Sequence, residues 1–360
     1  MQPRAGERVV VAMSGGVDSS VAAALLVEAG FDVVGISMRL WGESSASGCC
    51  SLDDFLDARR VASQLRIPYY VMDFRDTFKR AVVDPFVEEY GIGRTPNPCV
   101  LCNQAVKFSS FWDRARELGA EWLATGHYAR IVRDDATGSA QLWASRDASK
   151  DQSYFLFGVD RTVLERSLFP VGDLPKAVVR EHAKRLGMAV ADKPESQEIC
   201  FAPKGDYASF VERHARRQAA AGVVVDREGK VLAQHDGVHR FTIGQRRGLG
   251  ISASEPLYVT EIDAAAQRVR VGSRAEIVAT GLVATRVNWL QPLLPSVGGS
   301  FQVKIRSRFA PVEVTLERAT EQEFAALAPQ GLAAVTPGQA AVLYDRERVV
   351  GGGWIERALH

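Results

Sequence analysis

A loop of small residues, 14–20, constrains the fold of this chain more than any other segment. It follows an apolar run typical of a buried strand, residues 9–13, and precedes a helical pattern over residues 21–29 that Gly30 ends. Glycines let a backbone approach an anion closely and adopt positive φ. The N–H groups of a first helical turn and the helix dipole favour negative charge at the same point. The order of strand, loop and helix therefore predicts a phosphate site.

The form of this loop excludes two common nucleotide-binding motifs. A Walker A loop requires G-x-x-x-x-G-K-[ST], and residues 14–20 contain no lysine. A Rossmann fingerprint requires G-x-G-x-x-G, which is also absent from the loop. The run S-G-G-V-D-S instead resembles the pyrophosphatase loop of enzymes that cleave ATP between its α- and β-phosphates. Those enzymes adenylate a carbonyl or carboxylate oxygen and release pyrophosphate.

The first part of the chain alternates apolar strands with helical patterns. Further strands are predicted over residues 33–38, 68–74 and 122–128, and helices over residues 53–65 and 109–118. This alternation predicts an α/β fold with a parallel, Rossmann-like sheet and helices on both faces. Ligands of such sheets bind beyond the carboxyl ends of the strands, where Met38, Gly126 and His127 are also expected.

The pattern changes near residue 210, where strands begin to dominate. We predict an ATP-pyrophosphatase catalytic domain over residues 1–210 with a helical insertion around residues 165–198, a small central β-rich domain over residues 211–281 and a C-terminal β-barrel over residues 282–360. In the barrel, alternation over residues 301–306 predicts a strand that places Lys304 and Arg306 on one face.

Charge and composition limit where the chain can act. The net charge is +1, so a surface for nucleic acid must be a local patch. No apolar run approaches the length of a membrane span, and residues 1–8 lead into the first strand without a signal peptide. We therefore expect a cytoplasmic protein that has no membrane partner and whose cysteines start as thiols.

Three of the five cysteines are distinctive. Cys99 and Cys102 form a C-x-x-C pair, and Cys200 lies between Ile199 and Phe201. A buried, inert thiol fits Cys200 but not Cys99, which lies between prolines and a polar turn. Structural zinc usually needs two such pairs, and a redox C-x-x-C leaves the ATP loop unexplained. Adenylation combined with reactive thiols indicates that ATP makes an oxygen displaceable and that sulfur replaces it.

Six motifs in a fixed order make a resemblance specific. They are the loop over residues 14–20, P-N-P with C-N and K-F over residues 96–108, T-G-H-Y over residues 125–128, K-D-Q-S-Y-F-L over residues 150–156, E-S-Q-E-I-C over residues 195–200 and T-I-G-Q-R-R-G over residues 242–248. In this order the chain resembles the bacterial tRNA-specific 2-thiouridylases, which install sulfur at C2 of the wobble uridine, position 34. The resemblance implies an adenine nucleotide alpha-hydrolase-like fold, tRNA as the substrate, and ATP with magnesium as cofactors.

The resemblance also implies a role for each matching position. ATP would lie against Ala12, Met13, Ser14, Gly15, Gly16, Val17, Asp18, Ser19, Met38 and Gly126, with magnesium near Asp18. The target base would lie against Asn97, Pro98 and Cys99. Other tRNA contacts would come from His127, Lys150, Asp151, Gln152, Arg306, Ser307 and Gln339.

The same resemblance implies a sulfur relay through two cysteines. Cys200 would receive a persulfide from a sulfur-donor protein, and Cys102 would act as the nucleophile that leaves a Cys102–Cys200 disulfide. Thiolate is the reactive form, and Lys107 is the neighbouring charge expected to favour it. Many relatives carry an aspartate at the position of Cys99, where it serves as an acid and base, and a thiol with a pKa near 8.5 does not replace it. A second interpretation therefore stays open, in which Cys99, Cys102 and Cys200 hold a [4Fe–4S] cluster that binds sulfide.

Two other functions stay open as well. One is a different adenylating synthetase with the same loop, and the other is a nucleotide-binding sulfur carrier without catalysis. Cys49 and Cys50 are expected to be loop thiols without a catalytic role. The sequence does not determine the oligomeric state, the sulfur donor or the tRNA isoacceptors.

Overall fold

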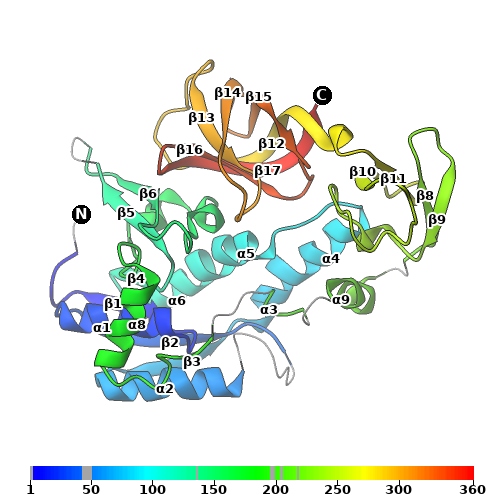
Figure 1. Ribbon diagram of the computed structural model, residues 1–360. Helices are drawn as coiled ribbons and strands as arrows, with labels where there is room; N and C mark the ends of the chain where they lie inside the picture. Colours follow the sequence, from blue (N-terminus) through cyan, green and yellow to red (C-terminus); the bar gives the residue numbers. More distant parts are fainter. Residues whose placement is uncertain (1–2, 43–50, 135–136, 195–198, 203–205, 217–218) are drawn as a thin grey trace. The chain divides into compact units, whose positions relative to one another are not determined.

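The computed structural model describes residues 3–42, 51–134, 137–194, 199–202, 206–216 and 219–360 (Figure 1). The chain forms two compact units. The first comprises Met1–Val82, Cys99–Lys204 and Glu347–Val349, and the second comprises Val83–Pro98, Gly205–Arg346 and Val350–His360. A short segment before Cys99 thus packs with the C-terminal half of the chain, while the predicted domain boundaries near residues 210 and 281 stay a prediction.

The first unit is built on a five-stranded parallel sheet in the order β3-β2-β1-β4-β7. Its strands are β1 (Arg8–Ala12), β2 (Asp32–Arg39), β3 (Tyr69–Asp73), β4 (Trp122–Thr125) and β7 (Ser167–Leu168). Ala12 lies beside Ile36 on one side and Thr125 on the other, so the strand ends that carry predicted site residues meet at one edge. The predicted parallel α/β sheet is confirmed.

Helices and one hairpin surround this sheet. The helices are α1 (Val17–Glu28), α2 (Leu52–Leu65), α3 (Arg75–Phe78), η1 (Lys79–Val83), α5 (Pro98–Leu101), η2 (Cys102–Ser110), α6 (Phe111–Glu117), η3 (Ser153–Leu156), α7 (Arg161–Leu164) and α8 (Lys176–Arg185). The hairpin of β5 (Ala129–Arg133) and β6 (Ala140–Ala144) pairs with Arg348. The sequence pattern predicted strands and helices of the parallel sheet in this part of the chain, but not this hairpin.

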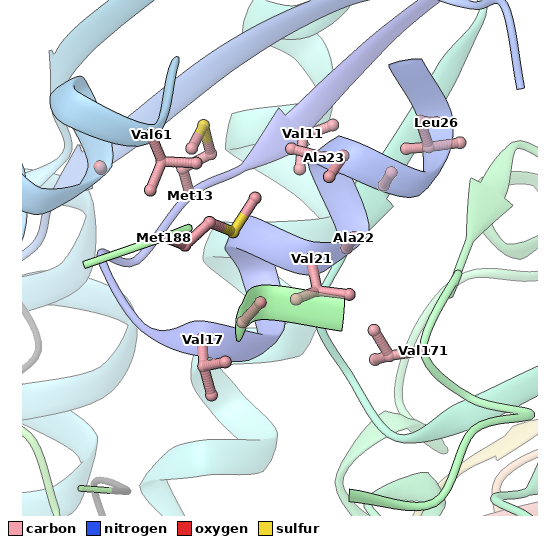
Figure 2. Close-up of a cluster of buried hydrophobic side chains, with 14 of the residues drawn as sticks. Val11, Met13, Val17, Val21, Ala22, Ala23, Leu26, Val61, Val171 and Met188 are labelled. Carbon is pink, nitrogen blue, oxygen red and sulfur yellow. The ribbon is translucent and has the colours of Figure 1, made fainter. Parts of the chain in front are cut away.

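The core of the first unit packs α1 closely against the sheet. Val9, Val10 and Val11 of β1 are fully buried, and side chains alternate along a strand, so both faces of the sheet are covered. Figure 2 shows Val11 next to α1, whose Val21 is also fully buried. Each such burial contributes about 1.5–3 kcal/mol. This packing holds the amino end of α1 rigidly beside the end of β1.

Three predicted boundaries were wrong, and the local cause of the first is clear. Helix α1 begins at Val17, four residues before its predicted start, because Gly16 is its N-cap with extended φ and ψ. Strand β4 ends at Thr125 rather than at residue 128. Strand β13 ends at Lys304, so Arg306 lies beyond it and the predicted shared face of these two side chains does not form.

The helix predicted over residues 109–118 starts much earlier. Helical backbone runs from Pro98 through η2 to α6, with a kink at Phe108. The Asn-Pro pair reads as a turn in the sequence, but proline is also favoured at the first position of a helix. Cys99 and Cys102 therefore lie in helical turns, and not beside a polar turn as predicted.

The second unit combines helical segments, a small sheet and a barrel. Its helices are α4 (Asp84–Gly91), α9 (Tyr207–His214), η4 (Val238–Arg240) and η5 (Ala275–Ile277). The sheet has the order β10-β11-β8-β9 and consists of β8 (Gly222–Val225), β9 (Val231–His235), β10 (Tyr258–Asp263) and β11 (Arg268–Gly272). The barrel strands are β12 (Val278–Trp289), β13 (Ser300–Lys304), β14 (Val312–Ala319), β15 (Glu323–Ala333), β16 (Ala340–Asp345) and β17 (Arg348–Leu359).

The barrel closes because its first and last strands pair. Its order is β12-β15-β14-β13-β16-β17, and β12 also pairs with β17. Closure removes exposed strand edges. The predicted C-terminal β-barrel is confirmed. In the part of the chain that the structure describes, no helix has the length and apolarity needed to cross a membrane.

Candidate active site

The loop after β1 has the backbone geometry of an anion site. Gly15 has φ +72°, and a β-carbon there would lie 2.2 Å from the carbonyl oxygen of Asp54. The Ser14 N–H donates to Ser19 Oγ at 3.1 Å, and Ser20 Oγ donates to Gly16 O at 2.8 Å. The hydroxyls of the first turn therefore fix the loop, and the amino end of α1 carries its positive dipole to the same place.

A cavity of about 340 Å³ opens beside this loop, a size within the usual range of ligand pockets. Its lining includes most of the predicted ATP contacts, namely Ala12, Met13, Ser14, Gly16, Val17, Asp18, Ser19, Met38 and Gly126. Gly15 belongs to the loop but not to the lining. Residues from three different strand ends are thus brought together as the topology predicts.

Four lysines also line the cavity: Lys107, Lys150, Lys176 and Lys193. Lys176 donates to both carboxylate oxygens of Asp18, at 2.6 and 2.8 Å, and Tyr128 donates its hydroxyl to the same carboxylate at 2.8 Å. Ammonium groups beside a glycine loop favour an anion, although carboxylates already pair with two of them, Lys176 and Lys193. Lys176, Lys193 and Tyr128 were not predicted as site residues.

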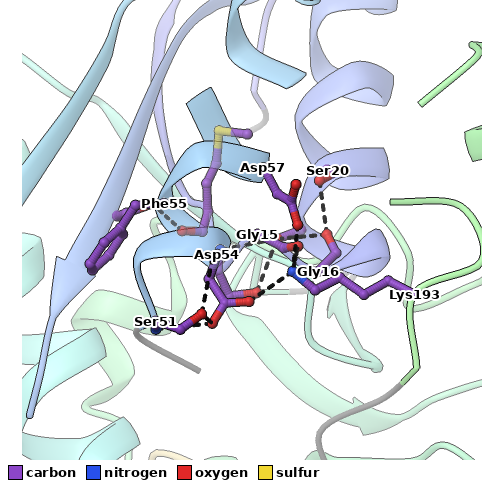
Figure 3. Close-up of polar contacts among 12 residues, drawn as sticks. Gly15, Gly16, Ser20, Ser51, Asp54, Phe55, Asp57 and Lys193 are labelled. Carbon is purple, nitrogen blue, oxygen red and sulfur yellow. Dashed lines mark hydrogen bonds and ion pairs between the residues drawn. The ribbon is translucent and has the colours of Figure 1, made fainter. Parts of the chain in front are cut away.

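Lys193 ties the loop to α2, as Figure 3 shows. Its Nζ donates to Gly15 O at 3.0 Å, to Asp54 Oδ1 at 2.8 Å and to Asp57 Oδ2 at 2.7 Å. Desolvation acts to lower the pKa of Lys193, but hydrogen bonds and charges from the two aspartates outweigh it and raise the pKa. The ammonium group therefore stays charged, and it holds the loop in the conformation that Gly15 permits.

Gly126 follows β4 where the strand end meets α1. A β-carbon at Gly126 would lie 2.6 Å from Ser19 N and 2.7 Å from Asp18 C. Because both atoms are backbone atoms, the contact cannot relax by rotation of a side chain. The absence of a side chain is what allows the end of β4 to contact the first turn of α1.

We expect Gly126→Ala to weaken ATP binding at least about tenfold and to lower the free energy of unfolding by about 1–3 kcal/mol, because the loop must shift. Calorimetric titration with ATP and thermal unfolding would measure both. Gly91→Ala is the matched control, since a β-carbon there would meet nothing within 4 Å. Unchanged ATP affinity in Gly126→Ala would contradict this account of the loop.

His127 lines the cavity and hydrogen-bonds through Nδ1 to Thr125 Oγ1 at 2.7 Å. Burial, and to a smaller extent the charge of Lys107, hold the pKa of His127 well below its usual value of 6.5. The imidazole is therefore neutral in the folded protein at neutral pH. A neutral ring in this position can exchange hydrogen bonds with a ligand without adding charge.

This lowered pKa predicts a loss of stability in acid. Above about pH 6.5 the ring is neutral in both states and contributes nothing, whereas below it only the unfolded chain gains the proton readily. The free energy of unfolding should fall by up to about 1 kcal/mol per pH unit more in the wild type than in His127→Gln. Urea unfolding at pH 7.5 and 5.5 would measure the difference, with exposed His360→Gln as the control. Equal losses in wild type and His127→Gln would contradict the assignment.

The residues predicted to contact tRNA near position 150 have two different surroundings. Lys150 and Gln152 line the cavity, and Gln152 Oε1 accepts from the Tyr128 N–H at 2.9 Å. Asp151 instead accepts from Ser145 N and Ser153 N, each at 3.1 Å. The Asp151 carboxylate thus holds the turn that presents Lys150 and Gln152.

The three predicted catalytic cysteines belong to the first unit but differ in exposure. Cys99 is exposed, Cys102 is buried at 7% exposure, and Cys200 is intermediate. Phe201 packs edge-on against Phe78 of α3, at 5.6 Å between ring centroids. Helix α3 also contacts η2, which begins at Cys102, so one helix touches the surroundings of both thiols.

The cysteines do not form a ready ligand set. Among the residues that the structure describes, which include all three thiols, no three His, Cys, Asp or Glu side chains are grouped to hold a metal ion. An iron–sulfur cluster would need Cys99, Cys102 and Cys200 as its thiolate ligands. Magnesium makes smaller demands, since one carboxylate and the phosphates of a nucleotide are enough, and Asp18 fits that role. Cys49 and Cys50 lie outside the described residues.

The remaining predicted tRNA contacts lie in the second unit. Asn97 and Pro98 are buried, and Ser307 is half-buried. The Arg306 guanidinium donates to Ala334 O at 2.7 Å, and the Gln339 amide donates to Thr95 O at 2.9 Å. Arg306 and Gln339 thus both have partners inside their own unit.

Family models match three successive parts of the chain. A family model described as tRNA methyl transferase HUP domain matches residues 7–204, one described as tRNA methyl transferase PRC-barrel domain matches residues 208–273, and one described as aminomethyltransferase beta-barrel domain matches residues 279–355. The matches together cover nearly the whole chain.

Named relatives match from end to end. The tRNA-specific 2-thiouridylase MnmA of Geotalea uraniireducens is 49% identical, over 98% of this chain and 96% of the relative. That of Geobacter metallireducens is also 49% identical, over 100% of this chain and 99% of the relative. Among solved structures, the U34-tRNA thiolase NcsA from Methanococcus maripaludis with its [4Fe-4S] cluster gives a TM-score of 0.35 at 17% identity, over 54% of this chain and 61% of that chain. A likeness that weak carries no argument about the cysteines.

Proposed function

The chain belongs to the tRNA-specific 2-thiouridylase family, and from this premise we propose that it replaces O2 of the tRNA wobble uridine with sulfur. The observation that carries the proposal is the lysine-rich cavity beside the loop of residues 14–16, in the same unit as three cysteines. A phosphate site alone would fit many enzymes. A phosphate site together with reactive thiols fits adenylation followed by displacement with sulfur.

In the proposed first step, the chain's loop and lysines bind ATP and orient its α-phosphate toward the uracil O2. The oxygen attacks the α-phosphate, and pyrophosphate leaves with the electron pair of the bridging bond. Backbone N–H groups of the loop and the lysine ammonium groups stabilise the charge that develops on the phosphates. Magnesium, when bound at Asp18, would supply further neutralisation of the phosphates. Lys176 now pairs with Asp18, so we expect it to turn toward the phosphates when the metal is present.

In the proposed second step, Cys200 carries a persulfide delivered by a sulfur-donor protein. Its terminal sulfur attacks C2 of the adenylated uridine, and AMP leaves. The Cys102 thiolate then attacks Cys200 Sγ, which breaks the sulfur–sulfur bond and leaves the outer sulfur on C2. A Cys102–Cys200 disulfide results, and a thiol reductant must reduce it before the next turnover.

We propose the persulfide relay through Cys102 and Cys200, and the iron content of the protein separates it from the alternative of a [4Fe–4S] cluster. Protein purified without oxygen should therefore hold only traces of iron and sulfide and should thiolate tRNA without added iron. Stoichiometric iron and loss of thiolation on its removal would contradict the relay. In the relay, Cys99 is an exposed residue beside the target base.

For tRNA we propose two groups of contacts. Asn97, Pro98 and Cys99 would face the target base, while His127, Lys150, Gln152, Arg306, Ser307 and Gln339 would lie near the tRNA. Asp151 would act by holding the turn around Lys150. The target uridine must leave its stack to reach the cavity, which costs less in a single-stranded loop than in a duplex. We also propose that the protein works in the cytoplasm, where tRNA and persulfide donors meet.

Release of AMP and pyrophosphate tests this function against its alternatives. We expect release only when tRNA with an unmodified wobble uridine is present. Another adenylating synthetase would release pyrophosphate with a different acceptor, and a non-catalytic carrier would bind ATP without cleaving it. AMP release that ignores tRNA would contradict the proposal. The methyltransferase wording of the family models names a different reaction, so S-adenosylmethionine should not replace ATP in this assay.

A further inference from the structure

Gln339, expected from the family resemblance to lie near tRNA, uses its side-chain amide within the protein. Its Nε2 donates to Thr95 O at 2.9 Å and to Pro96 O at 3.2 Å. Both carbonyls belong to the segment of residues 94–98, whose last two residues are proposed to face the target base. The side chain is therefore placed to act on that segment, whatever else it contacts.

The segment needs such a partner because of its sequence. Residues 94–98 read R-T-P-N-P, and prolines at 96 and 98 have no N–H to donate. A buried carbonyl without a hydrogen bond is costly, and Thr95, Pro96 and Asn97 are all buried. With two of its five backbone N–H groups missing, this stretch depends on donors from elsewhere in the fold for its buried carbonyls.

The barrel holds the same segment at other points. The Thr95 N–H donates to Pro337 O at 2.9 Å. The Arg94 guanidinium donates to Ile355 O at 3.1 Å and to Glu356 Oε2 at 3.0 Å. Three separate barrel residues therefore fix two consecutive residues of the segment, and all of them belong to the second unit.

The small sheet region contributes one more contact. Thr95 Oγ1 donates to Thr242 Oγ1 at 3.1 Å, and Thr242 opens the T-I-G-Q-R-R-G motif. Two residues later, a β-carbon at Gly244 would lie 2.4 Å from Ala334 Cβ. This motif thus packs on the loop before Gln339 while its first residue contacts the segment.

Arg306 also hydrogen-bonds to the loop before Gln339. It donates to Ala334 O at 2.7 Å and to Thr336 Oγ1 at 3.2 Å, and the Gln339 N–H donates to Thr336 O at 3.2 Å. Arg306 and Gln339, both expected to contact tRNA, therefore hydrogen-bond to the same loop, residues 334–338. The same loop accepts the Thr95 N–H through Pro337 O, so it supports the segment.

We propose that Gln339 is a positioning residue for the thiolation reaction. Its two hydrogen bonds fix the backbone of Thr95 and Pro96. The backbone that leads to Cys99 and Cys102 is thereby held in one conformation. This inference rests on the proposed function. It predicts that loss of Gln339 slows the reaction of bound tRNA while leaving the affinity for tRNA nearly unchanged.

Hydrogen exchange of the full-length protein without tRNA tests the positioning directly. Gln339→Leu keeps the size of the side chain and removes the two donated bonds, so amides of residues 94–97 should exchange roughly tenfold faster. Gln330→Leu, an exposed glutamine of the same barrel, is the control and should exchange like the wild type. Unchanged exchange in Gln339→Leu would overturn the proposal.

Kinetics separate positioning from direct tRNA contact. In Gln339→Leu we expect the single-turnover thiolation rate at saturating tRNA to fall about tenfold, with the Kd for tRNA within about twofold of wild type. Thr242→Val, which removes one hydroxyl at nearly constant shape, should produce a smaller change in the same direction. A weakened Kd with a normal rate at saturating tRNA would show that Gln339 contacts tRNA instead. If the wild type thiolates no tRNA at all, the proposed function fails, while the exchange result still decides the role of Gln339 in holding the segment.

Discussion

Cys102→Ser and Cys200→Ser are each expected to lower the rate of tRNA thiolation by at least about a thousandfold, because serine neither carries a persulfide nor attacks one. ATP binding should be unchanged, since neither cysteine lines the nucleotide cavity. Adenylation of tRNA should also proceed, so AMP-bound tRNA should accumulate in Cys200→Ser. Cys102→Ser should instead release AMP and keep the tRNA joined to Cys200 through a disulfide. Mass spectrometry of the tRNA after incubation with ATP would detect the adenylate and the missing sulfur together.

The two variants should differ in whether Cys200 carries the transferred sulfur. With a persulfide donor and labelled sulfur, Cys102→Ser should still hold sulfur on Cys200, whereas Cys200→Ser should not become labelled at that position. Cys50→Ser is the control for loss of a thiol, since no catalytic role is expected there. Loss of ATP affinity in either variant, or sulfur transfer that survives in Cys200→Ser, would contradict the relay.

Asp18→Ala is expected to lower adenylation by about a hundredfold or more, because the carboxylate proposed to bind magnesium is lost from the loop. The change also removes the partner of Lys176 and the acceptor of the Tyr128 hydroxyl. Exchange of labelled pyrophosphate into ATP in the presence of tRNA would measure the step. Persulfide transfer to Cys200 should remain normal, since it does not involve ATP.

Tyr128→Phe provides the matched control for Asp18. It removes one hydrogen bond to the carboxylate but leaves the carboxylate and Lys176 in place. We expect pyrophosphate exchange to fall no more than about fivefold, in keeping with the net value of one hydrogen bond. A loss in Tyr128→Phe as large as that in Asp18→Ala would show that the arrangement of the loop, and not the carboxylate, controls adenylation.

The phosphate loop could be predicted because its signal is local. A strand, two glycines and a helix follow one another within residues 9–29, and each has a physical reason to occupy its place. Met38 and Gly126 followed from the rule that strand ends meet at one edge of a parallel sheet. These parts of the site follow from the hydrophobic periodicity of the strands and helices and from their order along the chain. Both can be seen in a single sequence.

Two lysines of the cavity, Lys176 and Lys193, could not be predicted in the same way. Lys176 is 158 residues from Asp18, and Lys193 is 139 residues from Asp54, so only folding brings each pair together. One signal for Lys176 does exist in the sequence. It occupies the first position of α8, where a positive charge opposes the helix dipole, and such a placement indicates a specific partner.

The helical run that carries Cys99 and Cys102 was missed for another reason. Asn97 and Pro98 have the composition of a turn, and the same proline also suits the start of a helix. Tertiary contacts decide between the two. Thr95 and Pro96 are held by the barrel, so the chain enters the helix at Pro98.

Nucleoside analysis of the product tests the central claim most directly. Purified protein, ATP, magnesium, a persulfide donor and tRNA with an unmodified wobble uridine should yield 2-thiouridine at position 34, with one AMP formed for each sulfur inserted. The same reaction without ATP should yield none. Formation of AMP without 2-thiouridine, or of a thiolated base at another position, would contradict the account.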